Sequence, residues 1–591
     1  MEKWVELNTC TNIGETAKKY GISPIMATIL RNRNIEDPEI ENFLSPGPKC
    51  FHDPFMLKGM DRVVSVLHDR IEEGGKIRII GDYDVDGICA TYILLRGITL
   101  FGGDVDCVIP HRIEDGYGIS SKMVEAAHTE GRDTIITCDN GIAASEQVKL
   151  ANSLDMTVII TDHHEVPYEE INGEKYHRLP DADAITDPKL PGDEYPFKGI
   201  CGAFVALKVL ESYAKKYGFL GREDFNALAR ELTEFAALAT VCDVMELRDE
   251  NRALVRMGLR FMERSKNTGL KALLSCTGLE GKPLSPYHFG FVIGPCFNAS
   301  GRLDTSLKAL SLIEEADPET AKVKASALTE LNESRKAMTL EWSEKAFETV
   351  EAMEEPDKVL VLYLPGCHES LAGIIAGKVK ERYFRPTFVL TDAENGLKGS
   401  GRSIEAYDMY EGLVRADALL TKYGGHKMAA GVSLEKENLE AFRKNLNDLA
   451  ELSSEDFCET VRIDCELPLG AADMNLAREL LKLEPFGNGN ESPLFMDRDV
   501  TFISGTRMGK NGNYGRYRVL SKEGRSYEMV YFGSADDLEA MTDKKYGPGA
   551  GKKLHSGTNV SFKFDVCFGV EINSFRGTEK VQLRLKHYRY D

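Results

Sequence analysis

Three short apolar runs in the first third of the chain have the pattern of buried, parallel β-strands. Residues 76–80, 134–137 and 157–160 are rich in Ile, Val and Thr, and helical patterns separate them along the sequence. Short β-branched runs that alternate with helices predict a parallel sheet covered by helices. A further strand is predicted near residues 106–109. We therefore expect an α/β domain with a parallel sheet over residues 51–305.

The pattern becomes helical after this domain. Helical periodicity covers residues 307–353, and no proline occurs between Pro318 and Pro356. Such a stretch predicts a long connecting helix within a segment at 306–354.

A second, smaller α/β domain is expected over residues 355–450. A strand at 358–364, a helix at 370–382 and a strand at 386–390 follow one another in the order of a β-α-β unit.

The two ends of the chain complete the predicted organisation. Residues 1–50 form a lead segment, whose end is marked by the Pro and Gly residues at 45–48. Residues 451–591 contain short alternating strands and Gly-rich turns such as 511–515. This pattern predicts a C-terminal OB-type β-barrel.

Acidic and imidazole side chains follow each of the three strands predicted first. They are Asp82, Asp84 and Asp86 after the first strand, Asp139 after the second, and Asp162, His163 and His164 after the third. Because ligands of parallel sheets bind beyond the carboxyl ends of the strands, we expect these groups to meet in one crevice. Their mutual repulsion is costly unless a cation offsets it. For any one segment helix capping is the alternative, but capping explains neither two adjacent histidines nor three aspartates at alternate positions.

The types of side chain indicate which metal this crevice would bind. Carboxylate oxygens with a minority of imidazole and no thiolate suit Mg²⁺ or Mn²⁺, whereas a structural zinc site would contain cysteine. Seven candidate groups exceed what one octahedral ion binds while leaving room for a substrate. We therefore expect two ions, the usual arrangement for in-line attack on a phosphate.

The order of these motifs resembles that of the DHH phosphoesterase superfamily. Asp-Tyr-Asp-Val-Asp-Gly at 82–87, Asp-Asn-Gly at 139–141 and Asp-His-His at 162–164 occur in the family order, and residues 239–245 match its fourth motif. Later segments resemble the RecJ single-strand-specific DNA exonucleases, at residues 294–303, 399–403, 424–427 and 483–490. One position departs from the RecJ pattern, because Cys296 stands where a basic residue is usual.

The resemblance implies a role for each member of the acidic cluster. The principal metal ligands would be Asp84, Asp86, Asp139, His163 and Asp243. Asp82 is expected to be a further ligand or an orienting acid, and Asp162 to fix the tautomer of the His163 ring. His164 would lie beside the reacting phosphate, since neighbours in a chain seldom both bind one ion.

The resemblance also implies a set of substrate-binding residues. Arg112 would meet a terminal phosphate, with Tyr117 near it, although an exposed loop arginine is the alternative. The Gly-rich segments of the second domain would cradle phosphate, although a Gly-Gly pair is often only a turn. The full set is Arg112, Tyr117, Asn298, Arg302, Ser400, Arg402, Ser403, Gly424, Gly425 and His426.

Composition is ordinary for a globular protein, with 42% apolar and 28% charged residues. No apolar run approaches the roughly 20 residues that span a bilayer, and the N-terminus lacks the features of a secretory signal. The 13 cysteines are scattered without metal-type spacing. We therefore expect a cytoplasmic protein with reduced thiols and no membrane contact.

The net charge of −21 opposes the binding of a nucleic acid, so binding requires a local basic groove. Residues 498–532 interleave seven Arg or Lys residues with aromatic ones and could form a platform for a single strand. The alternative is that the tyrosines are core positions of strands and that the cations form a solvated face.

The metal site predicts metal-dependent hydrolysis of a phosphodiester. The resemblance to the RecJ exonucleases implies removal of nucleotides from single-stranded DNA in the 5′-to-3′ direction, in DNA repair and recombination. We expect a monomer, with single-strand-binding protein or a helicase as candidate partners. Three alternatives stay open. A DHH phosphodiesterase of short oligonucleotides would lack the barrel, a pyrophosphatase of the superfamily would need neither barrel nor aromatic platform, and a noncatalytic replication scaffold would have lost its ligands.

Overall fold

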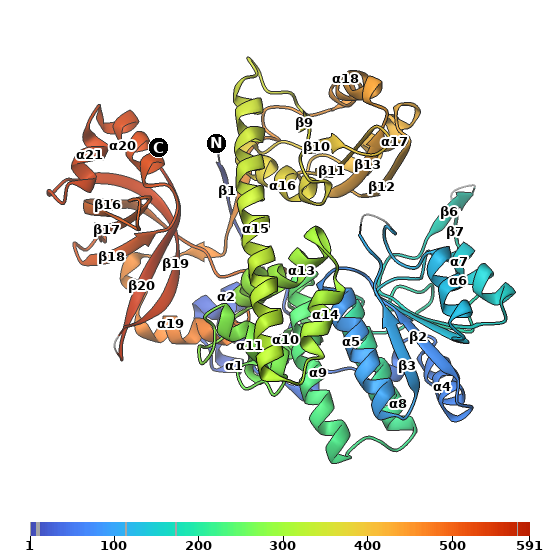
Figure 1. Cartoon of the computed structure of the whole chain (residues 1–591). Coiled ribbons are helices and arrows are strands. Elements are labelled where there is room, and N and C mark those ends of the chain that lie inside the picture. Colours follow the sequence, from blue (N-terminus) through green and yellow to red (C-terminus); the bar gives the residue numbers. More distant parts are fainter. Residues whose placement is uncertain (1, 8–11, 113–114, 172–173, 576, 591) are drawn as a thin grey trace. The chain divides into compact units, whose positions relative to one another are not determined.

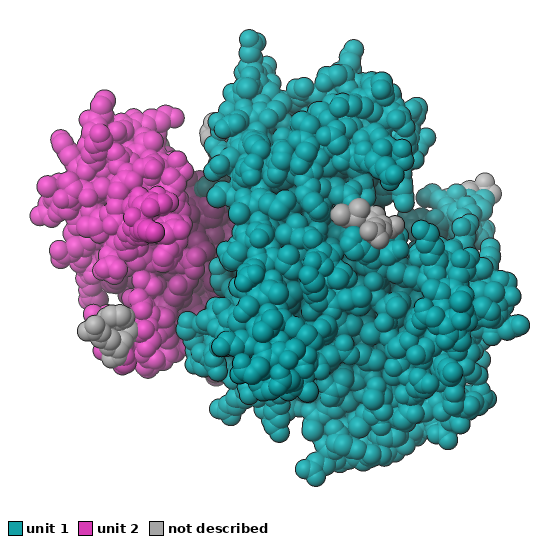
Figure 2. Space-filling model, viewed as in Figure 1, with its two compact units in different colours: residues 1–2, 52–243, 257–459 teal, residues 3–51, 244–256, 460–591 magenta. Residues whose placement is uncertain are grey.

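The computed structural model of the chain describes residues 2–7, 12–112, 115–171, 174–575 and 577–590 (Figure 1). The chain divides into two compact units, which Figure 2 colours separately. Unit 1 consists of residues 1–2, 52–243 and 257–459, and unit 2 of residues 3–51, 244–256 and 460–591. Among the described residues, no helix is both long and apolar enough to cross a membrane.

The first sheet of unit 1 is parallel throughout, as the β-branched runs predicted. Its strands, in spatial order, are β3 (Asp104–Val108), β2 (Lys76–Ile80), β4 (Thr134–Cys138), β5 (Thr157–Thr161) and β8 (Ala184–Thr186). Ile, Val and Thr side chains of these strands are buried on both faces, which explains the continuous apolar runs. The strands predicted at 134–137 and 157–160 each extend one residue further.

Helices cover both faces of this sheet (Figure 1). One face is covered by α4 (Met60–Glu72), α5 (Val85–Leu100) and α8 (Gly202–Lys216), and the other by α6 (Ser121–Thr129) and α7 (Ser145–Ser153). A hairpin of β6 (Tyr168–Ile171) and β7 (Glu174–His177) is inserted between β5 and β8. Because α5 is apolar on nearly all sides, it lies buried between the sheet and the helices α8 and α9 (Glu223–Cys242).

A group of helices follows the sheet in the chain. They are α9 (Glu223–Cys242), α10 (Asp249–Met262), α11 (Thr268–Cys276), α12 (Pro286–His288), the π-turn η3 (Phe289–Ile293) and α13 (Gly294–Leu303). The division between the two units falls within α10.

The predicted long connecting helix is α15 (Pro318–Glu351). The helical pattern before it forms a separate helix, α14 (Leu307–Ile313). The break has a local cause: Pro318 occupies the first turn of α15, and the Asp317 carboxylate caps it by accepting a hydrogen bond of 2.8 Å from the backbone N–H of Thr320.

The second domain of unit 1 contains a mixed sheet of five strands. Their spatial order is β12 (Lys422–His426), β13 (Ala429–Leu434), β11 (Leu397–Arg402), β10 (Thr387–Asp392) and β9 (Leu360–Tyr363). β9 and β10 are parallel and α16 (Ala372–Tyr383) connects them, as the β-α-β pattern predicted, whereas the other pairs are antiparallel. α15 and α16 pack on one face, and α17 (Met409–Arg415) and α18 (Leu439–Leu449) on the other.

Unit 2 contains the predicted C-terminal barrel. Five strands close on themselves in the order β16 (Phe495–Met508), β17 (Tyr514–Leu520), β18 (Ser526–Tyr531), β20 (Thr578–Arg589) and β19 (Phe562–Phe575), because β19 pairs again with β16. Closure removes the exposed edges of the sheet. Further elements of this unit are β1 (Glu2–Glu6) with β14 (Glu459–Ile463), β15 (Cys465–Glu466), α19 (Met474–Leu480), α20 (Ala535–Tyr546) and α21 (Ala550–His555).

The N-terminal residues share the core of the barrel unit. α1 (Ile13–Tyr20), α2 (Pro24–Asn32) and α3 (Asp37–Leu44) bury Met26, Leu30 and Ile40 together with Phe495 and Phe568 of the barrel strands. The compact units therefore group residues 3–51 and 244–256 with the barrel, and the predicted five-part division of the chain remains a proposal.

A buried arginine joins three distant segments of unit 2. The side chain of Arg252 is 1% exposed and donates to the backbone carbonyls of Phe43 (3.0 Å), Leu483 (2.7 Å) and Glu484 (2.7 Å). Burial lowers the pKa of Arg252 to about 9, so this guanidinium remains charged at neutral pH.

Arg252→Met should destabilise unit 2 by about 3 kcal/mol or more, because the substitution leaves several buried carbonyls without a donor. Arg260→Met is the matched control, since Arg260 is exposed on the same helix, and it should cost less than about 0.5 kcal/mol. Urea unfolding of the full chain measures both changes. Equal stability of the two variants would contradict this role of Arg252.

Candidate metal centre and anion pocket

The parallel sheet brings the predicted acidic groups to one edge. Asp82, Asp84 and Asp86 follow the end of β2, Asp139 follows β4, and Asp162 follows β5. Because these strands are parallel neighbours, their carboxyl ends lie at the same edge of the sheet. Asp243, at the end of α9, joins them from the helical region.

His163 lies at the centre of the cluster. Its Nε2 atom is 3.0 Å from an oxygen of Asp139, 3.6 Å from one of Asp86 and 3.8 Å from one of Asp243. Within the described chain, neither ring nitrogen has a hydrogen-bond partner. Burial lowers the pKa of His163 to about 4, so the ring is neutral at pH 7 and has a lone pair for a metal ion.

The carboxylates around His163 are buried and repel one another. Burial, and then neighbouring carboxylates, raise the pKa of Asp84 and Asp139 above their ordinary values and that of Asp243 to about 8. Burial also raises the pKa of Asp82. Such a cluster of like charges is stable in its ionised form only with bound cations.

Two groups of ligand atoms with no residue in common could each hold an ion, and a third group, Asp139, His163 and His164, overlaps both. One of the two separate groups consists of Asp82, Asp84 and Asp139, and the other of Asp86, His163 and Asp243; within each group the ligand atoms lie within 4.8 Å of one another. Oxygen ligands with one imidazole suit Mn²⁺ or Mg²⁺. The residues present therefore fit two divalent ions, as the sequence predicted.

Backbone groups hold two of these carboxylates in place. The two oxygens of Asp86 accept hydrogen bonds from the N–H groups of Gly202 (2.7 Å) and Ala203 (2.8 Å) at the start of α8. A Cβ atom on Gly202 would lie 2.7 Å from the Cβ of Asp139, so only glycine fits there. Asp84 accepts hydrogen bonds from the N–H groups of Asp86 and Gly87. Sequence analysis missed Gly202, because no local pattern links it to β2.

The turn after β4 has an unusual backbone conformation and is hydrogen-bonded to the end of β2. Asp139 has φ +61°, a conformation rare for residues other than glycine. The Asn140 side chain donates to the backbone carbonyls of Ile80 (3.1 Å) and Cys138 (2.9 Å), which joins the ends of β2 and β4. This bridge fixes the spacing between Asp139 and the aspartates after β2.

Asp162 orients the ring of His164. The sequence analysis expected it to fix the tautomer of His163 instead. An oxygen of Asp162 lies 2.7 Å from Nδ1 of His164 and accepts the backbone N–H of His163 at 2.8 Å. Burial lowers the pKa of His164, but the hydrogen bond and charge of Asp162 outweigh it and raise the pKa to about 9. His164 is therefore a cation at neutral pH beside the metal ligands. The Tyr117 hydroxyl lies 3.0 Å from Nε2 of the same ring.

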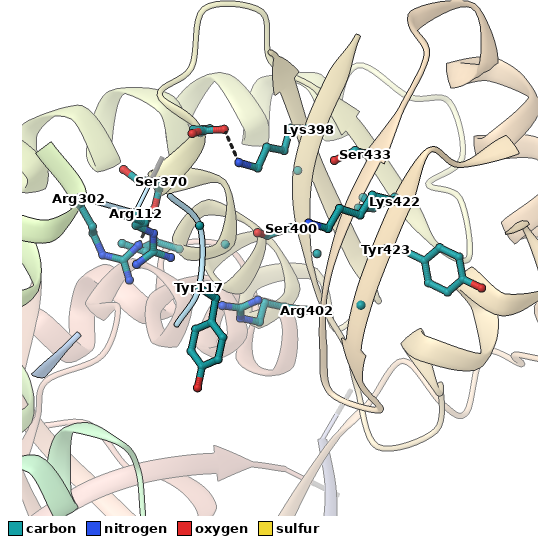
Figure 3. A pocket seen from close by; sticks show the side chains of 18 of the residues that line it. Arg112, Tyr117, Arg302, Ser370, Lys398, Ser400, Arg402, Lys422, Tyr423 and Ser433 are labelled. Atoms are coloured by element: carbon teal, nitrogen blue, oxygen red, sulfur yellow. Dashed lines mark hydrogen bonds and ion pairs between the residues drawn. The ribbon is translucent and has the colours of Figure 1, made fainter. Parts of the chain in front are cut away.

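A cavity of about 400 Å³ lies between the two domains of unit 1 and is lined by cations. Figure 3 shows the guanidinium groups of Arg112 and Arg302 next to one another, with Arg402 pointing toward them from β11. Burial and three neighbouring guanidinium groups lower the pKa of Arg302 to about 9, and burial also lowers that of Arg402. Buried cations that repel one another favour a bound anion. We call this cavity the arginine pocket.

The arginine pocket contains six of the ten predicted substrate-binding residues: Arg112, Tyr117, Arg302, Ser400, Arg402 and Gly424. Asn298, Gly425 and His426 are not among the residues that line it. Ser403 is 2% exposed and donates its hydroxyl to the Tyr407 carbonyl, so it stabilises the domain instead. Tyr83, Ser370, Lys398 and Lys422 are among the lining residues that sequence analysis missed. Their spacing carries no local signal, although Tyr83 lies inside the first acidic motif.

Cys296, which replaces a usual basic residue, is buried away from the arginine pocket. Its side chain is 1% exposed, and its sulfur accepts a hydrogen bond of 3.6 Å from Asn332 of α15. The thiol therefore packs between α13 and α15 as an apolar side chain would.

The predicted platform on the barrel is only partly supported. Tyr517 is fully buried, and Arg498 and Arg507 are paired with carboxylates, as the alternative of core positions and a solvated face predicts. Tyr514 (40% exposed) and Phe532 (51% exposed) remain accessible, with their rings 5.7 Å apart.

Metal binding should strengthen with pH. The pKa values of Asp139 and Asp243 are raised, so without metal the folded protein keeps protons on these carboxylates that the unfolded chain has lost. The stability of the metal-free folded protein therefore decreases as pH rises from about 4 through about 8. Mn²⁺ must displace these protons, and its affinity should rise by about tenfold per pH unit for each proton displaced. Thermal unfolding at pH 6, 7 and 8 should show a gain in Tm from Mn²⁺ that grows with pH. A gain independent of pH would contradict this electrostatic account.

Three family models match successive parts of the chain. The DHH family, N-terminal domain, matches residues 76–240, the DHHA1 domain matches residues 357–452, and the RecJ OB domain matches residues 463–587. These ranges contain the parallel sheet, the mixed sheet and the barrel.

Curated relatives match over most of the chain. The single-stranded-DNA-specific exonuclease RecJ of Bacillus subtilis (strain 168) is 32% identical and is matched over 96% of this chain and 68% of the relative. The RecJ exonuclease of Salmonella typhimurium is 35% identical over 75% of this chain and 78% of the relative.

Solved structures agree with these relatives. The crystal structure of RecJ in complex with Mn²⁺ from Thermus thermophilus matches with a TM-score of 0.81 and 26% identity, over 100% of this chain and 80% of that one. A crystal structure of exonuclease RecJ bound to manganese matches with a TM-score of 0.58 and 32% identity, over 68% of this chain and 96% of that one. On its fold, its acidic cluster and these matches, the chain belongs to the RecJ family of single-stranded-DNA-specific exonucleases.

Proposed function

We propose that this protein is a metal-dependent exonuclease that degrades single-stranded DNA from its 5′ end. One observation carries the proposal: Tyr117 joins the metal centre to the arginine pocket. Tyr117 lines the arginine pocket, and its hydroxyl donates to the backbone carbonyl of Asp139 at 3.1 Å. Tyr83 lines the same pocket and lies between Asp82 and Asp84 in the chain.

A pocket for a terminal phosphate beside the metal centre supports exonuclease action. The pocket offers a phosphate several hydrogen-bond donors from Arg112, Arg302 and Arg402. A terminal phosphate with two negative charges would bind these donors more strongly than an internal phosphodiester with one. A strand whose end is fixed there presents a nearby phosphodiester to the metal centre. The 5′ polarity rests on the family resemblance.

The roles of the acidic cluster follow from its geometry. Asp84, Asp86, Asp139, His163 and Asp243 would hold two ions, with Asp82 as a further ligand. Bound divalent ions would supply a nucleophilic hydroxide and offset charge on the phosphate oxygens. His164, held by Asp162 and charged at neutral pH, would stabilise the negative charge of the reacting phosphate.

The alternatives from the sequence are less well supported. The closed barrel in unit 2 is the feature that an enzyme of short oligonucleotides or a pyrophosphatase would not need. The buried and complete ligand set argues against a scaffold without catalysis. The proposal extends to a cytoplasmic monomer that acts in DNA repair and recombination, with single-strand-binding protein or a helicase as candidate partners.

Digestion of single strands labelled at either end tests the proposed activity. With Mn²⁺ or Mg²⁺, label at the 5′ end should be released first, and EDTA should abolish the release. Asp139→Ala should lower the rate at least about a hundredfold, because Asp139 belongs to one ligand group and lies 3.0 Å from His163 of the other. Full activity of this variant with added Mn²⁺, or early release from the 3′ end, would contradict the proposal.

A second measurement tests the arginine pocket. Arg402→Ala should reduce the preference for a 5′-phosphate over a 5′-hydroxyl by about tenfold, since a charge-assisted hydrogen bond is lost. Arg382→Ala is the control, because Arg382 pairs with Glu351 and is not among the residues of the pocket. The ratio of kcat/KM for the two substrates gives the preference. An equal ratio in both variants would show that the arginine pocket does not recognise the 5′-phosphate.

A further inference from the structure

The residue after Asp243 has an unusual backbone conformation. α9 ends at Cys242, and Val244 has φ +56°. This left-handed conformation is a genuine outlier for a β-branched residue, because its Cβ crowds the backbone. The Val244 side chain is 65% exposed, so packing of that side chain does not hold the conformation. Strain of this kind persists only where surrounding contacts enforce it.

Asn488 makes the contact that holds Val244. Its side-chain amide donates to the Val244 carbonyl at 2.7 Å, and its own backbone carbonyl accepts the N–H of Leu247 at 2.8 Å. The carbonyl of the next residue, Gly489, accepts a hydrogen bond of 2.9 Å from Arg248. All these residues belong to unit 2, so the chain is clamped immediately after the last residue of this segment of unit 1.

The loop that carries Asn488 is itself firmly fixed. Gly487 and Asn490 exchange two backbone hydrogen bonds of 3.0 Å. The Asn490 side chain is fully buried and donates to the carbonyls of Leu483 and Pro485, both at 2.8 Å. This loop lies in the segment at 483–490 that resembles RecJ proteins. Asn488 is thus presented from a rigid support.

Over the described ranges, the Asp243 carboxylate lacks the backbone donors that hold Asp84, Asp86 and Asp162. Backbone N–H groups donate at least twice to the carboxylates of Asp84, Asp86 and Asp162. In the part of the chain that the structure describes, no backbone N–H donates to the Asp243 carboxylate, which is 30% exposed. The position of this carboxylate therefore depends on its own side-chain torsions and on the backbone where α9 ends and Val244 follows.

From these contacts we infer that Asn488 is a positioning residue of the metal centre, which acts through the backbone of Val244 to aim the carboxylate of Asp243 at the ion shared with Asp86 and His163. The inference rests on the proposed metal-dependent hydrolysis. It assigns a role to a side chain that is not itself a ligand.

Titration of the full-length protein with Mn²⁺, followed by the EPR signal of the free ion, tests the inference. Asn488→Ala should weaken the binding of one of two ions by about tenfold, the usual effect of losing a group that supports a ligand. Asn475→Ala is the matched control, because Asn475 is exposed in the same unit, and should bind both ions like the unsubstituted chain. At limiting Mn²⁺, Asn488→Ala should lower kcat with KM for a single strand unchanged, and excess Mn²⁺ should restore kcat.

A rescue separates positioning from general destabilisation. Glycine adopts the left-handed conformation without strain, so the double variant Asn488→Ala/Val244→Gly should regain Mn²⁺ affinity to within about threefold of the unsubstituted chain. Thermal unfolding without metal records the stability of each variant, and only the loss in Mn²⁺ affinity should be rescued.

Two results would overturn the inference: Asn488→Ala binds both ions as tightly as Asn475→Ala, or the added glycine restores no affinity. Failure of the unsubstituted chain to bind Mn²⁺ would overturn the proposed function, and this inference with it. The two failures are therefore distinguishable in one titration series.

Discussion

The repulsion among buried carboxylates at the carboxyl edge of the parallel sheet is the constraint on which the rest of the structure depends. Burial raises the pKa of Asp84, Asp139 and Asp243, and nearby carboxylates, Asp86 in each case, raise it further. A protein core does not tolerate such a cluster in ionised form without cations. The rigid sheet, the Asn140 bridge and the backbone donors at Gly202 keep these groups together at this cost, which is the mark of a functional site.

Positive charge is concentrated in the arginine pocket, next to the metal centre. Arg302 and Arg402 are largely buried in the arginine pocket, where their own repulsion favours an anion. Tyr117 lines the arginine pocket and contacts Asp139 of the metal centre. A bound strand would therefore meet the arginines at its terminal phosphate and the metal ions at a nearby phosphodiester. A net charge of −21 is thus compatible with DNA as substrate, because the local field decides binding and much of the acidic surplus lies elsewhere.

The chain also shows how one ligand can depend on residues distant in sequence. Val244 is strained and exposed, and Asn488, 244 positions later, holds its carbonyl. The same loop is anchored by Arg252, whose guanidinium donates to the carbonyls of residues 482 to 484. Strain beside a metal ligand and dense hydrogen bonding behind it are two parts of one arrangement.

The sequence by itself determined the parallel sheet, the two α/β domains and the barrel, as well as the acidic groups at the ends of β2, β4 and β5. These features depend on local patterns: strands alternate with helices, and the residues after a parallel strand must lie at the sheet edge. Only the tertiary structure decided that Asp162 orients His164, that Gly202 supports Asp86, that Ser403 is buried and that Lys398 and Lys422 line the arginine pocket. Those relations join segments far apart in the chain or depend on the direction of a side chain. Hydrophobic periodicity carries no information about either, because it reports which face is buried and not which neighbour that face meets.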